Sequence, residues 1–417
     1  MGSPMLFQPE LEAMPAGERA SLQRRRLAEL LKRLRASPSP YWQEKLADVD
    51  SDELEALPFT TKAELRDRYP FGALAVPLEE TVRVHASSGT RGKPTVVAYT
   101  AHDVGVFAEV NARAIACAGG RADDVLHVAY GYGLFTGGLG LHYGGERLGA
   151  TVVPASGGNT ALQLELLADL GADGLACTPS FGLLLAERAA EAGVRDRIRL
   201  RYGVFGAEPW SEALREQLEG AWGIDACDIY GLSEVIGPGV AMECREGKGA
   251  LHVFDDHFLP EIVGGELVLT TLTKEAFPVL RYRTGDVTSF VDEPCPCGRT
   301  HRRIARLSGR VDDMLVVRGV NVYPSEIEAV VLEDHVLSPQ YAIVVDRREA
   351  LVGLEVHTEL AAGGDPEAVR VRLVERLESR LRVRVEVVVG PPGSIPRQEV
   401  GKARRVWERT GEEDPFR

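Results

Sequence analysis

The stretch Ser87-Ser88-Gly89-Thr90-Arg91-Gly92-Lys93-Pro94 lies between two β-rich runs, one ending at residue 85 and the other covering residues 96–99. Its glycines let backbone amides turn toward an anion, its hydroxyl groups add donors, and Lys93 with Arg91 adds positive charge. It is not a Walker loop, because only two residues separate the glycines, proline follows the lysine and a strand comes next. By itself the stretch fits a phosphate-binding loop and an ordinary hairpin with a Ser/Thr-rich tip equally well.

Strands and helices alternate on both sides of this stretch. Runs rich in β-branched residues at 81–85, 125–129 and 151–154 alternate with helical runs at 103–117 and 161–170, which predicts an α/β domain with largely parallel sheets. Ahead of them, residues 18–35 place their leucines on one face of a charged segment, as in an amphipathic surface helix.

Two changes in residue composition and in expected secondary structure divide the rest of the chain. After about residue 243, short strands separated by Gly, Pro and Asp predict a β subdomain at about 244–309, with strands at 265–271 and 279–282. From residue 310, strands and one leucine-rich helix predict a compact α+β unit. Its expected strands are 314–317, 342–345, 351–357 and 383–389, and the helical leucines are 373, 377 and 381. The domains expected are therefore residues 1–309 and 310–417.

Composition excludes several classes of protein. The chain of 417 residues is 44% hydrophobic and 26% charged, and no run approaches about 18 apolar residues, so a membrane protein is not expected. Its net charge of −14 repels nucleic acid and anionic lipid, so any bound phosphate must be met by local cations. Six scattered cysteines argue against a disulfide scaffold and fit a reducing cytoplasm.

Five more motifs carry groups suited to a nucleotide. A tyrosine face can stack on a purine, a glutamate is a hard oxygen ligand for Mg²⁺, and one aspartate can accept hydrogen bonds from both hydroxyls of a ribose. Each motif also has an ordinary interpretation, as a strand end with a helix cap, a turn aspartate or a solvated lysine. In chain order they are Gly206-Ala207-Glu208-Pro209, Tyr230-Gly231-Leu232-Ser233-Glu234, Tyr282-Arg283-Thr284-Gly285-Asp286, Ser308-Gly309-Arg310-Val311-Asp312-Asp313 with Val316-Val317-Arg318-Gly319-Val320-Asn321, and Ile395-Pro396-Arg397-Gln398-Glu399-Val400-Gly401-Lys402-Ala403.

Taken together and in this order, from about Phe59 to Trp407, the motifs resemble those of the acyl-adenylate-forming enzyme superfamily, most closely its phenylacetate-CoA ligase branch. The resemblance implies a large N-terminal α/β domain with stacked sheets and a small mobile C-terminal domain. It implies an AMP-forming acid–thiol ligase that uses ATP and Mg²⁺ to make an acyl adenylate, and then coenzyme A to make the thioester, releasing AMP and pyrophosphate. A homodimer is expected from the resemblance alone.

The resemblance also assigns roles to individual residues. Lys402 and Glu234 are the catalytic residues, with Glu234 as the magnesium ligand; Asp312 is the hinge, and Arg318 and Gly319 face coenzyme A. Arg91 stands where the family usually has threonine, and the segment around Lys402 carries one extra residue relative to the branch. The nucleotide-binding residues implied are Ser87, Ser88, Gly89, Thr90, Gly92, Lys93, Gly206, Ala207, Glu208, Pro209, Tyr230, Gly231, Ser233, Asp286 and Arg310.

The stretch Tyr130-Gly131-Tyr132-Gly133-Leu134-Phe135 combines bulky rings with glycines, as in an apolar slot for a flat ring, although core aromatics in a Gly-rich turn give the same pattern. By resemblance, Tyr130, Phe135, Ala207 and Pro238 line an aryl pocket. An aryl or arylalkyl carboxylic acid is the expected substrate, and phenylacetate is the first choice.

Cysteine spacing suggests a metal site as well. Cys295-Pro296-Cys297-Gly298 is half of a zinc site, and Cys244 with His252 would complete a tetrahedral set of structural type, with His257 and His301 as rival ligands. Two free thiols beside a glycine turn are the alternative. Five arginines follow at 299, 302, 303, 306 and 310, which suit either the phosphates of coenzyme A or a face paired with acids.

Other functions share most of these features. An adenylating enzyme with another acceptor, such as a carrier protein or a deazaflavin that receives AMP, would need the same first half-reaction. A catalytically inactive nucleotide-binding homologue would keep the fold, although the joint presence of Glu234, Asp286 and Lys402 argues against it. The expected partner is a small molecule, with neither nucleic acid nor membrane.

Overall fold

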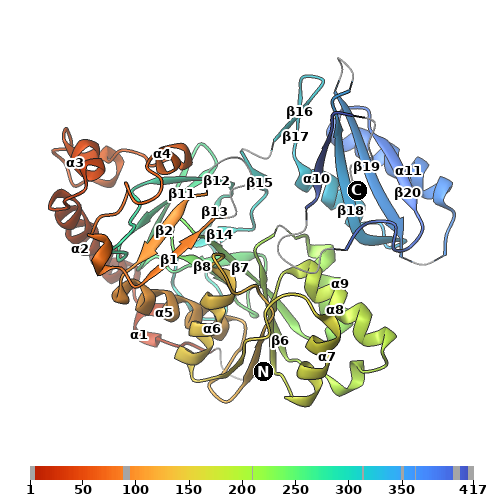
Figure 1. Cartoon of the computed structure of the whole chain (residues 1–417), viewed down its shortest axis with the longest axis horizontal. Coiled ribbons are helices and arrows are strands. Elements are labelled where there is room, and N and C mark those ends of the chain that lie inside the picture. Colours follow the sequence, from red (N-terminus) through yellow and green to blue (C-terminus); the bar gives the residue numbers. More distant parts are fainter. Residues whose placement is uncertain are drawn as a thin grey trace.

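The computed structural model describes residues 5–87, 94–208, 210–311, 314–348, 352–361, 363–397 and 404–411. Figure 1 shows a large body, coloured red to cyan, and a smaller blue unit beside helices α8 and α9. The chain therefore has a mixed α/β fold with a separate C-terminal domain. Within the described residues, no helix is both long enough and apolar enough to cross a membrane.

The largest sheet has a parallel half that follows the expected alternation of strands and helices. Strands β3 (Val125–Val128), β4 (Thr151–Val153), β5 (Gly174–Cys177), β6 (Tyr202–Gly206) and β7 (Asp225–Leu232) pair in the order β4-β3-β5-β6-β7, all in parallel. Their crossovers carry α6 (Gly137–Leu148), α7 (Thr160–Asp169), α8 (Pro179–Glu191) and α9 (Glu212–Trp222). Parallel strands need such crossovers, and the carboxyl ends of the strands meet at one edge.

The other half of this sheet is antiparallel, so the expectation of largely parallel sheets holds for β3–β7 only. The order continues from β7 through β8 (Gly237–Glu243), β9 (Ala250–Val253) and β14 (Arg303–Ala305) to β13 (Phe290–Val291). A separate antiparallel sheet contains β10 (Phe258–Val263), β11 (Glu266–Thr271), β12 (Tyr282–Val287) and β15 (Gly309–Arg310). The strand expected at 279–282 is displaced, because Arg281 has a positive φ of 41° and β12 begins after it.

The N-terminal helices pack on this body. They are α1 (Pro9–Glu12), α2 (Ala16–Arg35), α3 (Pro40–Leu46) and α4 (Lys62–Asp67), and the expected leucine face of α2 is buried at Leu22, Leu27, Leu30, Leu31 and Leu34. The hairpin of β1 (Arg83–Ala86) and β2 (Val96–Tyr99) lies between α4 and α5 (Ala101–Cys117) in Figure 1 and confirms the strands expected around the glycine-rich loop. Glycines of α6 allow close packing on α5, since a Cβ at Gly144 would lie 2.5 Å from that of Asn111.

The C-terminal unit has its own core. Strands β20 (Glu386–Gly390), β19 (Gly353–Leu360), β18 (Leu337–Asp346) and β21 (Val406–Arg409) form its sheet in that order, and α10 (Pro324–Leu332) and α11 (Pro366–Leu381) pack on it. The hairpin β16 (Leu315–Val317) and β17 (Val320–Val322) precedes them. Leu332 of α10 instead packs into the hydrophobic cluster formed by α8 and α9, so this helix joins the two domains.

Candidate active site

The site residues gather where parallel strands end. Tyr130 follows β3, Ala207 and Glu208 follow β6, and Ser233 and Glu234 follow β7, all at the carboxyl edge of the large sheet. Ligands of open α/β sheets bind at this edge. Three of the sequence motifs, which lie far apart along the chain, are thereby brought to one edge of the sheet.

Asp286 is the centre of a buried polar cluster. The hydroxyl of Tyr230 donates to its Oδ2 at 2.5 Å, and Nη1 of Arg310 donates to its Oδ1 at 2.6 Å. Arg310 lies opposite Asp286 in the pairing of β15 with β12. Burial of Tyr230, together with the neighbouring Asp286 carboxylate, raises the pKa of the Tyr230 hydroxyl well above its ordinary value. The hydroxyl therefore stays protonated and the side chain neutral. Three of the residues predicted to bind a nucleotide are therefore in direct contact.

Glu234 lies in the tight turn between β7 and β8. Its carboxylate is only 5% exposed, and its Oε1 has no hydrogen-bond partner among the described residues. Two buried side chains fix the backbone of this turn. Lys274 donates a hydrogen bond to the carbonyl of Val235 at 2.8 Å, and Tyr99 donates one to the carbonyl of Ile236 at 2.9 Å. Burial lowers the pKa of Lys274 to about 8.

The turn after β6 has a backbone that few side chains tolerate. A Cβ at Gly206 would lie 2.2 Å from the carbonyl oxygen of Ile229, and Ala207 has a φ of 72°. Beyond it, Oε1 of Glu208 accepts a hydrogen bond from the backbone amide of Ser180 at 2.7 Å, at the start of α8. This contact fixes the Glu208 carboxylate at the N-terminus of α8.

Sequence reasoning missed Asp228 and Lys62. Asp228 points to the same side of β7 as Tyr230, two residues away, and burial together with Glu243 raises its pKa to about 6. The signal in the sequence is its position two residues before the Tyr-Gly-x-Ser-Glu string, because residues two apart on a strand point to the same side. Lys62 comes from a distant helix, and its Nζ lies 3.9 Å from Oε1 of Glu234.

Two glycines of α6 lie close against two of the residues expected in the aryl pocket. A Cβ at Gly140 would lie 2.5 Å from Cγ of Pro238, and one at Gly137 would lie 2.4 Å from the ring of Phe135. Tyr130 is buried, which raises the pKa of its hydroxyl well above the ordinary value, and the Cys177 and Glu208 groups add to that shift. The ring of Tyr130 therefore lies near the turn that carries Ala207 and Glu208.

Several predicted residues are outside the described parts of the chain, namely Ser88, Gly89, Thr90, Gly92, Lys93, Pro209, Asp312 and Lys402. Ser87 is described, and it closes the base of the β1–β2 hairpin by exchanging hydrogen bonds with Thr95 at 2.9 and 3.0 Å. Arg318 and Gly319 form the turn between β16 and β17, with φ values of 52° and 80°. Arg318 donates to the carbonyl of Val352 at 3.2 Å.

The four residues expected to bind zinc meet in the structure. Sγ of Cys244 lies 3.4 Å from Sγ of Cys295, and Sγ of Cys297 lies 3.4 Å from Nε2 of His252. All four are buried, with their ligand atoms within 4.8 Å of one another. Three thiols and an imidazole in this arrangement suit a tetrahedral metal.

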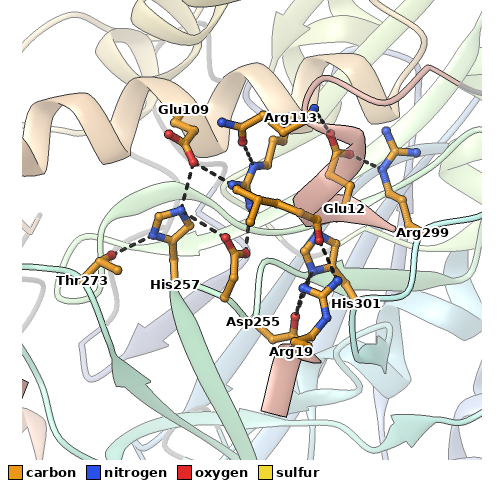
Figure 2. A network of polar contacts seen from close by, with 12 residues as sticks. Glu12, Arg19, Glu109, Arg113, Asp255, His257, Thr273, Arg299 and His301 are labelled. Carbon is orange, nitrogen blue, oxygen red and sulfur yellow. Dashed lines mark hydrogen bonds and ion pairs between the residues drawn. The ribbon is translucent and has the colours of Figure 1, made fainter. Parts of the chain in front are cut away.

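The two rival histidines belong to a separate network, shown in Figure 2. His257 lies 2.8 Å from Oγ1 of Thr273 and 3.1 Å from Glu109, whereas His301 lies 2.8 Å from Asp255. The same network joins the N-terminal helices to the body, since Arg19 donates to Asp255 at 2.9 Å. His252 is therefore the histidine that can complete the cysteine cluster.

The five arginines after the cysteine pair are occupied within the chain. Nε of Arg299 donates to the buried Glu12 at 2.7 Å, Arg306 pairs with Glu212 at 3.0 Å, and Arg310 binds Asp286. Arg302 pairs with Asp292 at 3.3 Å and Arg303 donates to the carbonyl of Glu293 at 3.0 Å. The interpretation as a face paired with acids is favoured over a phosphate site.

Comparison with known proteins identifies the family. The family of AMP-binding enzymes matches residues 18–257, and the AMP-binding enzyme C-terminal domain matches residues 319–410. The chain is 46% identical to the phenylacetate-coenzyme A ligase of Thermus thermophilus, over 97% of this chain and 99% of that one. It is 49% identical to the phenylacetate-coenzyme A ligase of Escherichia coli, over 85% of each chain. The chain belongs to the AMP-binding enzyme family.

Solved structures of one relative differ in how well they superpose. A 2-hydroxyisobutyryl-CoA ligase in the postadenylation state, in complex with 2-HIB-AMP, matches with a TM-score of 0.87 at 27% identity, covering 96% of this chain and 92% of that one. The same ligase in the thioesterification state, with 2-HIB-AMP and CoA, gives a TM-score of 0.70 at 28% identity, covering 96% and 91%. The fold is thus shared along nearly the whole chain.

Proposed function

We propose that this chain is an aryl acid:CoA ligase, with phenylacetate as its first substrate, that makes an acyl adenylate and then the CoA thioester. The observation that carries the proposal is the contact of Tyr230, Asp286 and Arg310, with Tyr230 near the carboxyl end of β7 and Glu234 in the turn that follows this strand. The near full-length identity to phenylacetate-coenzyme A ligases supports the choice of acid and acceptor.

The first half-reaction activates a poor electrophile. A carboxylate oxygen of the acid attacks the α-phosphorus of ATP, and the bond from that phosphorus to the bridging oxygen breaks, with its electron pair leaving on pyrophosphate. Tyr230 offers its ring to the purine, and Asp286 can accept hydrogen bonds from the ribose hydroxyls once it exchanges its present partners. Lys402 would contribute an ammonium to the developing phosphoryl charge.

Glu234 fits a magnesium ligand. Its buried Oε1 has no hydrogen-bond partner among the described residues, and a carboxylate in that condition is suited to a hard cation. A Mg²⁺ ion held there would supply positive charge to the phosphate oxygens.

The second half-reaction needs another arrangement of the C-terminal domain, because Lys402 and coenzyme A approach the same acyl group. We infer that the described arrangement is the adenylation one, a view supported by the higher TM-score against the postadenylation state. Rotation about Asp312 would then bring the turn of Arg318 and Gly319 toward the acyl adenylate. The absence of a side chain at Gly319 would leave room for pantetheine.

The proposal includes a structural zinc ion at Cys244, His252, Cys295 and Cys297, since four protein ligands leave no position for substrate. The six cysteines, all of which the structure describes, form no disulfide, which is consistent with the reducing, cytoplasmic location that we propose. A homodimer is a further part of the proposal, to be tested by sedimentation analysis.

The decisive experiment is AMP release from ATP, assayed with phenylacetate and with 2-hydroxyisobutyrate, each with and without coenzyme A. The proposal expects AMP and phenylacetyl-CoA in equal amounts, and much less product from the alkyl acid. Pyrophosphate exchange without thioester would indicate another acceptor. No ATP consumption with any acid would indicate an inactive homologue.

A further inference from the structure

Lys62 reaches the candidate active site from the N-terminal helices. It is the first residue of α4, whose N-cap Thr61 forms a capping box with Glu64. The residue before the cap is tied to the sheet that carries Asp286, because the carbonyl of Thr60 accepts from the amide of Arg283 at 2.9 Å and Thr60 pairs with Tyr282. The backbone that presents Lys62 is thus fixed to the site.

The ammonium of Lys62 faces Glu234 without binding it tightly. Nζ lies 3.9 Å from Oε1, which is beyond hydrogen-bond distance, and the Lys62 side chain is 37% exposed while that of Glu234 is 5% exposed. An ion pair between two exposed side chains would be an ordinary surface salt bridge, which contributes little to stability. Here one partner is a buried carboxylate whose Oε1 has no hydrogen-bond partner among the described residues.

The position of the Lys62 ammonium suits phosphate binding better than a permanent ion pair with Glu234. A carboxylate and phosphate oxygens that share one metal ion lie side by side, so an ammonium beside that carboxylate can reach the phosphate. Lysine is a compact charge on a flexible stem and serves widely as a phosphate ligand. In a chain of net charge −14, a polyphosphate must meet its cations locally.

We propose that Lys62 binds the β- and γ-phosphates of ATP and stabilises pyrophosphate as it leaves; this inference rests on the proposed function. In the step concerned, the bond from the acid oxygen to the α-phosphorus forms and the bond from that phosphorus to the bridging oxygen breaks. Pyrophosphate takes the electron pair and no proton is transferred. Lys62 meets that charge from the N-terminal domain, whereas Lys402 belongs to the C-terminal one.

The test compares Lys62→Met and Lys62→Arg with a control, Lys32→Met, which removes the same charge from an exposed position on α2. The first measurement is calorimetric binding of inorganic pyrophosphate in the presence of Mg²⁺. The second is the rate of each half-reaction, with acyl adenylate supplied for thioester formation. We expect Lys62→Met to weaken pyrophosphate binding about 10-fold and to slow adenylation about 10- to 100-fold.

Thioester formation from supplied acyl adenylate should stay within about twofold, Lys62→Arg should recover most of the binding, and Lys32→Met should match the wild type. Wild-type pyrophosphate binding by Lys62→Met, or an equal loss in both half-reactions, would overturn the inference. A wild-type protein that adenylates no aryl acid would instead contradict the proposed function, and the pyrophosphate measurement would still decide the role of Lys62.

Discussion

Arg310 and Asp286 face each other across the pairing of β15 with β12, with Nη1 of the arginine 2.6 Å from Oδ1 of the carboxylate. Asp286 lies on β12, and Arg310 ends β15, the last strand before the β16–β17 hairpin. The same carboxylate also receives the hydroxyl of Tyr230. A nucleotide bound at Asp286, as proposed, would compete with both partners, and the pair would then connect nucleotide binding with the proposed junction of the domains.

Replacing Asp286 with Asn should weaken this centre in a specific way. Arg310 and Tyr230 would lose a charged acceptor, and charge-assisted hydrogen bonds contribute about 1.5 to 3 kcal/mol each. We expect kcat/KM for ATP to fall about 100-fold, with the KM for the acid changed much less. Steady-state kinetics with each substrate varied in turn measures both. A larger effect on the acid would show that Asp286 does not face the nucleotide.

Much of this centre could be predicted from sequence, because its residues lie within short strings whose spacing reflects a strand and the turn after it. Tyr230 to Glu234 and Tyr282 to Asp286 are of this kind. Lys62 could not be predicted, since nothing near it in the sequence indicates that Thr60 pairs with β12. The same holds for the contact between Arg299 and Glu12, two residues 287 positions apart.

The β subdomain shows a related limit. Gly, Pro and Asp residues predict short strands after residue 243, but this composition does not specify which sheet a strand joins. β9 and β14 pair with the large sheet, whereas β10, β11 and β12 form another. Pairing depends on side chains from distant segments, such as Arg303 opposite His252, and a single sequence does not display those contacts.

The cysteine cluster gives a prediction with a matched control. His252→Gln should remove the metal, whereas His257→Gln should retain it, because His257 contacts Thr273 and Glu109 instead. We expect about one zinc per chain in the wild type and in His257→Gln. Metal analysis by mass spectrometry after extensive dialysis measures it. Zinc lost equally from both variants, or lacking in the wild type, would contradict the assignment.

The two half-reactions should separate in variants of the C-terminal segment. Lys402→Ala should slow adenylation by about two to three decades while sparing thioester formation from supplied acyl adenylate. Asp312→Pro should do the reverse, because a fixed φ at the hinge hinders rotation. Rapid-quench measurement of each half-reaction tests the pair. Equal losses in both steps for either variant would contradict the division of labour.

Gly140 offers a test of the aryl pocket. In Gly140→Ala the new Cβ would lie 2.5 Å from Cγ of Pro238 and 2.9 Å from the ring of Phe107, so one of these walls must shift. We expect the KM for phenylacetate to rise about 10-fold while the KM for ATP stays the same. Gly105→Ala on α5 is the control, because a Cβ there meets nothing within 4 Å. An unchanged KM for the acid would place the pocket elsewhere.

The last prediction concerns Glu328, which lies on α10 and accepts a hydrogen bond from the hydroxyl of Tyr341 at 2.5 Å. Burial raises its pKa from 4.5 to about 7, although Tyr341 and Arg405 lower it in part. A carboxyl whose pKa is higher in the folded state binds its proton more tightly there. Stability from this group is therefore fully present below pH 4.5 and is lost as the pH rises through about 7.

We expect the C-terminal domain to lose about 2 to 3 kcal/mol of stability between about pH 5 and pH 8 on this account. Glu328→Gln keeps a neutral side chain of similar shape and should flatten that part of the pH dependence. Denaturant unfolding followed by the fluorescence of Trp407, in a variant that lacks the other tryptophans, measures it. A slope that persists unchanged in Glu328→Gln would assign the titration to another group. Because Leu332 on the same helix packs against α8 and α9, the same titration should weaken the contact between the domains.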